Sequence, residues 1–245
     1  MLRLAILITF VCFCSGAEIP SSIKKCKVDN DACLIKAANL LLQKGVDEYI
    51  KLGLKSVDPL LIEKMDINQG GNGPVTIDLK FRNVYLHGLG KAEIYKVHGF
   101  QTDPDKNKLE MRLKTKLGTI KGPYQIKGQM LVLPISGTGN VTLNLENLDI
   151  TLKFLTKKIE KNGKTYMSIE KSKFSYDVTG ANVNFTNLFN GDKELGDNMN
   201  RFLNINWKIL LDELKKPISS SFSILFKDLL NEMFNNIPYN EFFEI

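Results

Sequence analysis

A long helical pattern of apolar residues lies near the C-terminus, between residues 199 and 234. Apolar side chains recur there every third or fourth residue, which is the spacing of one stripe on a helix. The stripe consists of Met199, Leu203, Trp207, Leu210, Leu214, Ile218, Phe222, Leu225, Leu229 and Met233. At ~1.5 Å per residue this helix is roughly 50 Å long. Its second half is apolar over most of its surface, so other elements must surround it.

From Val75 to about Phe185 the hydrophobic period changes to two, which is typical of strands with one apolar face. The clearest runs cover residues 75–82, 109–117, 141–146, 148–154 and 174–178. Strands with one polar face predict an antiparallel sheet. Asp103-Pro104-Asp105 and Asn162-Gly163 are typical of hairpin turns.

Two of these strands change phase midway. After Phe81 the apolar positions resume at Val84, and after Leu145 they resume at Leu148. A phase slip inside a strand predicts a β-bulge, and bulges bend sheets. The C-terminal helix is the long apolar element available to fill such a curve. The predicted class is therefore α+β, a long C-terminal helix wrapped by a strongly curved antiparallel sheet, with short N-terminal helices.

The N-terminal part predicts two short helices ahead of the sheet. Asp31 is the expected cap of the first, and Leu34 and Leu41 lie on its apolar face. A second helical piece is expected over 46–52. A loop over 70–74 separates this region from the strands.

Composition predicts one ordinary globular domain after a secretory signal. The chain has 245 residues, of which 24% are charged, and its net charge of +6 is spread along the chain rather than in blocks. Nucleic-acid binding is therefore not expected. Arg3, a short apolar run over 4–13 and the small residues Ser15 to Ala17 are typical of a signal peptide. We expect a signal peptide over 1–17, one domain over 18–245, and a secreted monomer.

Cysteine positions agree with an oxidising compartment. Cys12 and Cys14 fall within the predicted signal, which leaves Cys26 and Cys33. Two cysteines in a secreted chain predict one disulfide. It would close a short N-terminal loop and contribute about 2–3 kcal/mol in the chain-entropy model.

Catalytic patterns are absent from the sequence. It contains neither G-x-S-x-G nor H-E-x-x-H. His87 and His98 are the only histidines, too few for a zinc site without a free cysteine. We expect no enzyme activity, no metal and no cofactor.

Two surface features remain open. Asn140-Val-Thr and Asn184-Phe-Thr are glycosylation sequons. A group of lysines surrounds the Asn162-Gly163 turn: Lys157, Lys158, Lys161 and Lys164. This group is either a solvated hairpin tip or a contact for an anionic membrane.

Several motifs together resemble a known family. They are C26-x6-C33, L-G-L-K-S-V-D-P-L at 52–60, L-K-F-R-N-V-Y-L-H-G-L at 79–89, G-P-Y-Q-I-K-G-Q-M-L-V-L-P-I-S-G-T-G at 122–139, N-L-F-N-G-D-K-E-L-G-D-N-M-N-R-F-L-N at 187–204, and a final I-P-Y-N-E-F-F. With these motifs the chain resembles the takeout and juvenile-hormone-binding protein family of insects. Moth haemolymph carriers of that family have a second disulfide in the body of the fold. Since no cysteine follows Cys33 here, the resemblance favours the takeout branch.

The resemblance implies a long helix in a curved sheet, with an internal apolar tunnel for a lipid-like ligand. The expected function is a secreted carrier for a small hydrophobic molecule, such as a terpenoid like juvenile hormone, a fatty acid or an odorant. The alternative is a surface-active protein of the wider tubular lipid-binding group, which would contact anionic membranes through the lysine-rich hairpin.

Residues expected to line the tunnel come from the helix and from the inward faces of the strands. They are Trp207, Leu211, Ile218, Phe222, Leu225, Phe226, Tyr124, Met130, Val132, Leu143, Ile150, Phe154, Phe174 and Tyr176. The two tyrosines are the expected polar contacts with a ligand. We expect Phe222 and Leu225, beyond a kink at Pro217, to form tunnel wall, and Leu210 and Leu214 to be packed core. The first helix is a candidate lid.

Overall fold

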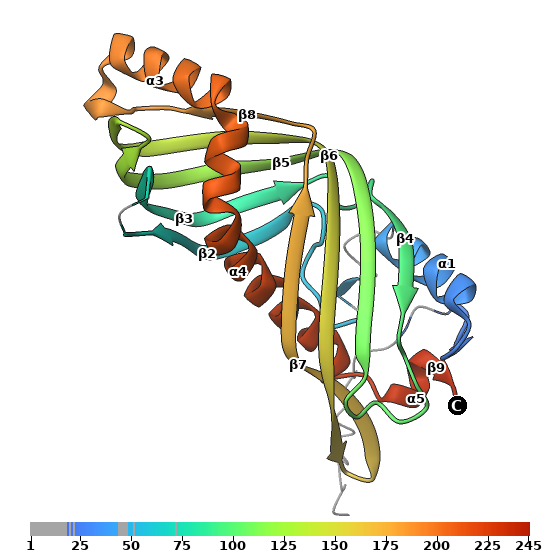
Figure 1. The fold of residues 1–245 in the computed structure, drawn as a ribbon. Helices are drawn as coiled ribbons and strands as arrows, with labels where there is room; N and C mark the ends of the chain where they lie inside the picture. Colours follow the sequence, from blue (N-terminus) through green and yellow to red (C-terminus); the bar gives the residue numbers. More distant parts are fainter. Residues whose placement is uncertain (1–18, 20, 22, 44–48, 51, 72) are drawn as a thin grey trace, which may run out of the picture.

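An antiparallel sheet that bends around helix α4 (Trp207–Phe234) forms the centre of the molecule (Figure 1). The computed structural model describes residues 19, 21, 23–43, 49–50, 52–71 and 73–245. The predicted α+β class and the position of the long C-terminal helix are confirmed. The predicted signal peptide lies outside the described residues, as does most of the helical piece expected over 46–52.

Two very long strands run through the whole sheet. The strands are β2 (Leu60–Gln69), β3 (Val75–His87), β4 (Glu93–His98), β5 (Lys108–Met130), β6 (Leu133–Lys161), β7 (Lys164–Asp177) and β8 (Gly180–Phe185). β5 and β6 pair with each other along their full lengths. In one half of the sheet the order is β2-β3-β5-β6-β8, and in the other half it is β4-β5-β6-β7.

The sheet bends where these two strands exchange partners (Figure 1). β6 pairs with β8 up to Glu146 and with β7 from Asp149. Asn147, between them, has a positive φ of 47°, and the expected phase slip after Leu145 falls at this change of partner. A Cβ on the facing Gly118 would lie 2.8 Å from Leu148 Cδ2. Glycine therefore lets the strands approach inside the bend.

A β-bulge supplies further curvature in β3. Its register against β5 shifts between Phe81 and Tyr85, and Asn83 has a φ of 51°. This confirms the bulge predicted after Phe81. The Asn162-Gly163 hairpin is also confirmed, since Lys161 pairs with Lys164 across it.

The helices differ from the expectation at two points. They are α1 (Asp31–Leu42), the short η1 (Phe189–Gly191), α3 (Lys193–Ile205), α4 and α5 (Tyr239–Phe242). The single helix predicted from residue 199 is wrong in its first part, because Asn206 leaves helical geometry and separates α3 from α4. Asn30 caps α1 in place of Asp31, since its side chain accepts a hydrogen bond from Cys33 N. Within the described residues no helix is long and apolar enough to cross a membrane.

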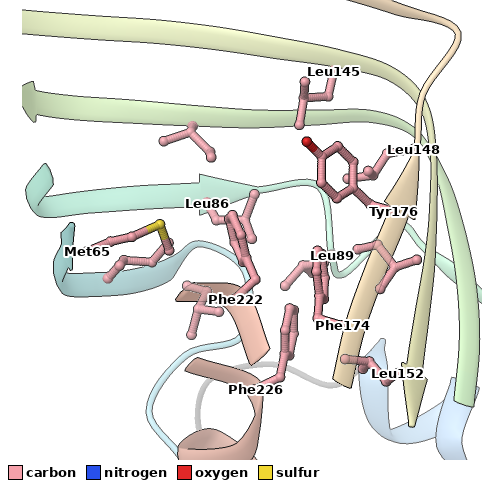
Figure 2. Close-up of a cluster of buried hydrophobic side chains, with 14 of the residues drawn as sticks. Met65, Leu86, Leu89, Leu145, Leu148, Leu152, Phe174, Tyr176, Phe222 and Phe226 are labelled. Atoms are coloured by element: carbon pink, nitrogen blue, oxygen red, sulfur yellow. The ribbon is translucent and has the colours of Figure 1, made fainter. Parts of the chain in front are cut away.

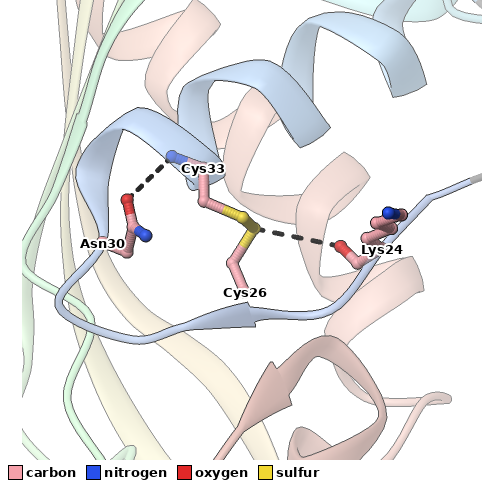
Figure 3. Close-up of a disulfide and its surroundings, with 4 residues drawn as sticks. All are labelled: Lys24, Cys26, Asn30 and Cys33. Carbon is pink, nitrogen blue, oxygen red and sulfur yellow. Dashed lines mark hydrogen bonds between the residues drawn. A yellow bond between two sulfur atoms is a disulfide. The ribbon is translucent and has the colours of Figure 1, made fainter.

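The two ends of the described chain meet beside α1. Figure 3 shows the predicted disulfide between Cys26 and Cys33, whose Cα atoms are 5.7 Å apart. Strand β1 (Cys26–Lys27) pairs in parallel with β9 (Phe243–Glu244). Lys25 Nζ also donates to the Asn240 carbonyl, at 2.9 Å. The disulfide is therefore confirmed, and it joins α1 to the strand that pairs with the C-terminal segment.

Helix side chains pair with every edge of the bent sheet. Each of four asparagines accepts from the backbone N–H of an edge-strand residue and donates to the carbonyl of that same residue. The pairs are Asn39 with Ile94 of β4, Asn200 with Phe185 and Asn204 with Val183 of β8, and Asn231 with Ile169 of β7. On β2, Ser221 Oγ donates to the Asp66 carbonyl. These bonds satisfy edge groups that would otherwise be open to another strand.

Candidate functional site

An apolar cavity of about 130 Å³, here called the sheet cavity, lies between α4 and the concave face of the sheet. Side chains of β2, β3, β5, β6, β7 and β8 form one wall, and α3 and α4 form the other. Apart from Asn204, Trp207 and Tyr176, the lining residues have hydrocarbon or thioether side chains. Figure 2 shows part of this interior, with Phe174 extending from β7 toward Phe222 and Phe226, and Tyr176 extending toward Leu145 and Leu148.

A second apolar cavity of about 220 Å³, the terminal cavity, lies beside the C-terminal part of α4. Its walls include the inner face of α1, the N-terminal segment and residues 241–243 of the C-terminal segment. Among the described residues, its charged lining residues are Lys24, Lys25 and Glu241. Phe226 lines both cavities, so the two follow one another along α4.

Tyr176 presents a free polar group to the sheet cavity. Its hydroxyl is buried and has no hydrogen-bond partner among the described residues. Burial, followed by the charges of Asp212 and Asp177, raises the pKa of Tyr176 well above its ordinary 10.0. The phenol therefore keeps its proton and can donate a hydrogen bond to a ligand. Asn204 is less available, because its amide oxygen and one of its two amide hydrogens are already bonded to Val183.

The structure brings most of the predicted lining residues together around the sheet cavity. They are Trp207, Leu211, Ile218, Phe222, Phe226, Met130, Leu143, Ile150, Phe174 and Tyr176. All come from β5, β6, β7 and α4, and all except Met130 lie on faces that the apolar pattern predicted to be inward. Contact of these residues with a ligand stays a prediction.

Four predicted residues lie elsewhere. Val132 is wrong as a lining residue, because it is in the turn between β5 and β6 and is 81% exposed. Phe154 is buried and Leu225 half-buried, but neither lines either apolar cavity. Tyr124 is also outside the lining. Burial raises the pKa of Tyr124 to about 12, and its hydroxyl donates to the Thr186 carbonyl at 2.7 Å, so it is not free for a ligand.

The expected division of α4 into wall and core is partly wrong. Phe222 does line the sheet cavity, but so do Leu210 and Leu214, which were expected to be packed core. The reason is geometric, since α3 and the first half of α4 border the cavity as closely as the residues beyond Pro217. The helix itself continues through Pro217.

Sequence reasoning missed the asparagines that fix the helices to the sheet edges. Asn200, Asn204 and Asn231 all lie within helices, where asparagine is a poor helix former. Asparagine at these helical positions could have indicated that the side chains bind another element. The terminal cavity as a whole was also missed, because its walls come from segments with no shared periodicity.

The remaining candidates are at the surface. Asn140 and Asn184 are exposed on the paired strands β6 and β8. In the lysine-rich hairpin, Lys158 pairs with Glu160 and Lys161 donates to the Asn235 carbonyl. His98 Nδ1 lies 2.8 Å from Asp31 Oδ2. Among the described residues no group of three or more histidine, cysteine or acidic side chains is placed to hold a metal ion.

Comparisons with known proteins agree with this architecture. The model of the family described as haemolymph juvenile hormone binding protein matches residues 5–244. The circadian clock-controlled protein daywake of Drosophila melanogaster is 27% identical over 229 residues, covering 92% of this chain and 88% of that protein. Daywake of Drosophila yakuba is 28% identical over 235 residues, with the same coverage of 92% and 88%.

A solved structure shares the fold over nearly the whole chain. The crystal structure of Epiphyas postvittana Takeout 1 superposes with a TM-score of 0.77 at 27% identity, covering 91% of this chain and 100% of that one. The family match, the bent sheet around one helix and the apolar interior all point to the same family. The chain belongs to the haemolymph juvenile hormone binding protein family of carriers for hydrophobic ligands, and within it is similar to takeout and daywake.

Proposed function

We propose that this chain is a secreted, non-enzymatic carrier that holds one small hydrophobic molecule in its apolar interior. The observation that carries the proposal is the pair of apolar cavities that follow α4. Binding would be driven by burial of apolar ligand surface, about 25 cal/mol per Å² before the costs of association. The chain would act as a monomer without a cofactor.

The lining favours a neutral ligand such as a terpenoid ester or an odorant. Within the part of the chain that the structure describes, no charged residue lines the sheet cavity, and an unpaired carboxylate buried there would be costly. A neutral carbonyl or ether oxygen could accept from the Tyr176 hydroxyl. A fatty acid would instead place its carboxylate in the terminal cavity, near Lys24 and Lys25.

The terminal cavity is the proposed entrance. The inner face of α1 and the N-terminal segment cover it, so their displacement would expose the interior. Strand β1, which joins these segments to the C-terminus, is only two residues long. The disulfide joins the N-terminal segment to α1, so the two would move together as one lid.

Secretion is proposed from the signal-like sequence over 1–17 and is supported by the disulfide, which is typical of oxidising compartments. Cleavage after Ala17 is the expected processing. Asn140 and Asn184 are exposed and are proposed as glycosylation sites. Intact mass of the secreted protein, before and after removal of N-glycans, tests all of these points.

Titration with the fluorescent probe 1-N-phenylnaphthylamine tests the carrier function. One probe molecule should bind per chain, and a terpenoid methyl ester or a long-chain fatty acid should displace it. Absence of saturable binding by the purified protein would contradict the proposal.

Ionic strength separates this function from the membrane-binding alternative. Docking of the lysine-rich hairpin on anionic vesicles should weaken steeply with added salt, because exposed charges are screened. Binding in an apolar cavity should change little. Strong, salt-sensitive vesicle binding without probe binding would favour the alternative.

A further inference from the structure

The boundary between the two cavities can be located on two elements, α4 and β6. On α4, Phe222 lines the sheet cavity, Leu229 lines the terminal cavity and Phe226 lines both. On β6 the boundary falls between Ile150 and Leu152, which are successive inward residues. Phe226 is therefore the side chain that stands between the cavities.

Stacked aromatic rings hold Phe226 in this position. Its ring lies 5.7 Å from that of Phe174 with an interplanar angle of 9°. Phe222 lies 5.2 Å from Phe174 and 6.4 Å from Phe226. Figure 2 shows the three rings together in the interior. Stacked rings can slide or rotate past one another without breaking a hydrogen bond.

The helix backbone on either side of Phe226 is fixed to β7. Ser172 Oγ donates to the Ser223 carbonyl at 2.8 Å. Asn231 accepts from Ile169 N at 2.7 Å and donates to the Ile169 carbonyl at 3.1 Å. A passage between the cavities therefore requires rotation of the Phe226 side chain rather than movement of α4.

The volumes of the two cavities indicate which ligands would need this rotation of Phe226. At about 130 Å³ and 220 Å³, each cavity is smaller than the ~300 Å³ at which ligand pockets usually begin, but the two together exceed that limit. Resting on the carrier function proposed above, we propose that Phe226 is the residue that sets ligand length. Short apolar molecules occupy one cavity with the ring in place, and long chains bind across both cavities by displacing it.

A series of primary alcohols with 8 to 18 carbons, competing with 1-N-phenylnaphthylamine, tests this assignment. Each added methylene should raise affinity about fourfold until the chain reaches Phe226, after which the gain should fall in the wild-type protein. In Phe226→Leu the gain should continue, so that the affinity ratio of the longest to the shortest alcohol rises at least tenfold. In Phe226→Trp the ratio should fall.

Phe154→Leu is the matched control, because Phe154 is buried but lines neither cavity. It should keep the wild-type length profile. The assignment is overturned if a folded Phe226 variant keeps that profile, or if Phe154→Leu shifts it as far as Phe226→Leu does. If the wild-type protein binds neither probe nor alcohol, the carrier function itself fails. Because the two Phe226 variants change volume in opposite directions, either one that folds decides the question.

Discussion

The sheet cavity and the terminal cavity are both apolar, but different parts of the chain enclose them. The sheet cavity lies within the bend of continuous strands, and α3 and α4 are bonded to its edges by asparagine side chains. The terminal cavity is covered by α1 and by the described N-terminal and C-terminal segments, which meet in the two-residue strands β1 and β9. The sheet cavity therefore exists because the sheet is curved. The terminal cavity exists because α1 and the terminal segments cover one end of that sheet.

The bonds that close the two cavities also differ in strength. Asn200 and Asn204 each form two hydrogen bonds with backbone groups of β8. At the other end, Asn39 fixes α1 to β4 with the same two bonds, but the N-terminal segment meets the C-terminal one through two-residue strands and the half-exposed ion pair of Lys25 and Glu241, a type of contact worth about 0–1 kcal/mol. Local opening should therefore occur first at the terminal cavity. The predictions below test this difference, beginning with the largest effect.

The largest loss of stability is expected for a phenylalanine that lies in packed core rather than at a cavity wall. Phe154 and Phe222 have the same side chain, but only Phe222 lines a cavity. Phe154→Ala should lower the free energy of unfolding by about 3–5 kcal/mol and leave probe affinity unchanged. Phe222→Ala should lower the free energy of unfolding by less, because part of its ring already faces the cavity. It should also change probe affinity. Urea unfolding and probe titration measure both. Equal costs with unchanged affinity would place Phe222 in the packed core.

Removal of the disulfide should act on the terminal cavity. Replacing Cys26 and Cys33 with serine should lower the free energy of unfolding by about 2–3 kcal/mol and accelerate probe release. Equilibrium affinity should change less than the release rate, because the sheet cavity is intact. Stopped-flow displacement of 1-N-phenylnaphthylamine measures the rate. An unchanged rate would mean that ligand does not leave beneath α1.

Loss of one asparagine pair should act on stability alone. Asn204→Ala leaves the N–H and carbonyl of Val183 unpaired and should cost about 1–3 kcal/mol without accelerating probe release. Asn198→Ala, at an exposed position on the same helix, is the control and should have a negligible effect. Faster release from Asn204→Ala than from the disulfide variant would reverse the assignment of the entrance.

The smallest effect is expected at Tyr176. Tyr176→Phe removes a buried hydroxyl that has no partner among the described residues, so the free energy of unfolding should change by less than about 1 kcal/mol. Affinity for a terpenoid methyl ester should fall by about three- to tenfold, the effect of one neutral hydrogen bond. Affinity for a hydrocarbon probe should be unchanged. Equal changes for ester and hydrocarbon would show that the hydroxyl does not contact the ligand.

The sequence predicted those features that depend on short-range patterns. Alternation along β5 and β6 identified the inward faces except at Leu117, which is exposed beside the bend, and the phase slip after Phe81 located a bulge. The isolation of Cys26 and Cys33 predicted their bond. Each of these follows from residues close together in the chain, where side-chain direction is set by strand geometry.

The missed features depend on contacts between distant segments. The break at Asn206 has no signal in the apolar stripe, because Leu203, Trp207 and Leu210 keep helical spacing across it. The turn at Leu131 and Val132 also has no signal in the sequence, because neither is a usual turn residue. Leu131 nevertheless adopts the positive φ of 56° that the turn requires. Which apolar residues face a cavity depends on how far the sheet bends, and periodicity does not report that distance.

Native mass spectrometry of the purified, secreted protein tests the central claim most directly. The account predicts a bound species in which each chain carries one small apolar molecule, released on denaturation and recovered by solvent extraction. After delipidation, 1-N-phenylnaphthylamine should refill the site with a stoichiometry of one. A protein found only at its ligand-free mass, which also fails to bind the probe saturably, would contradict the account.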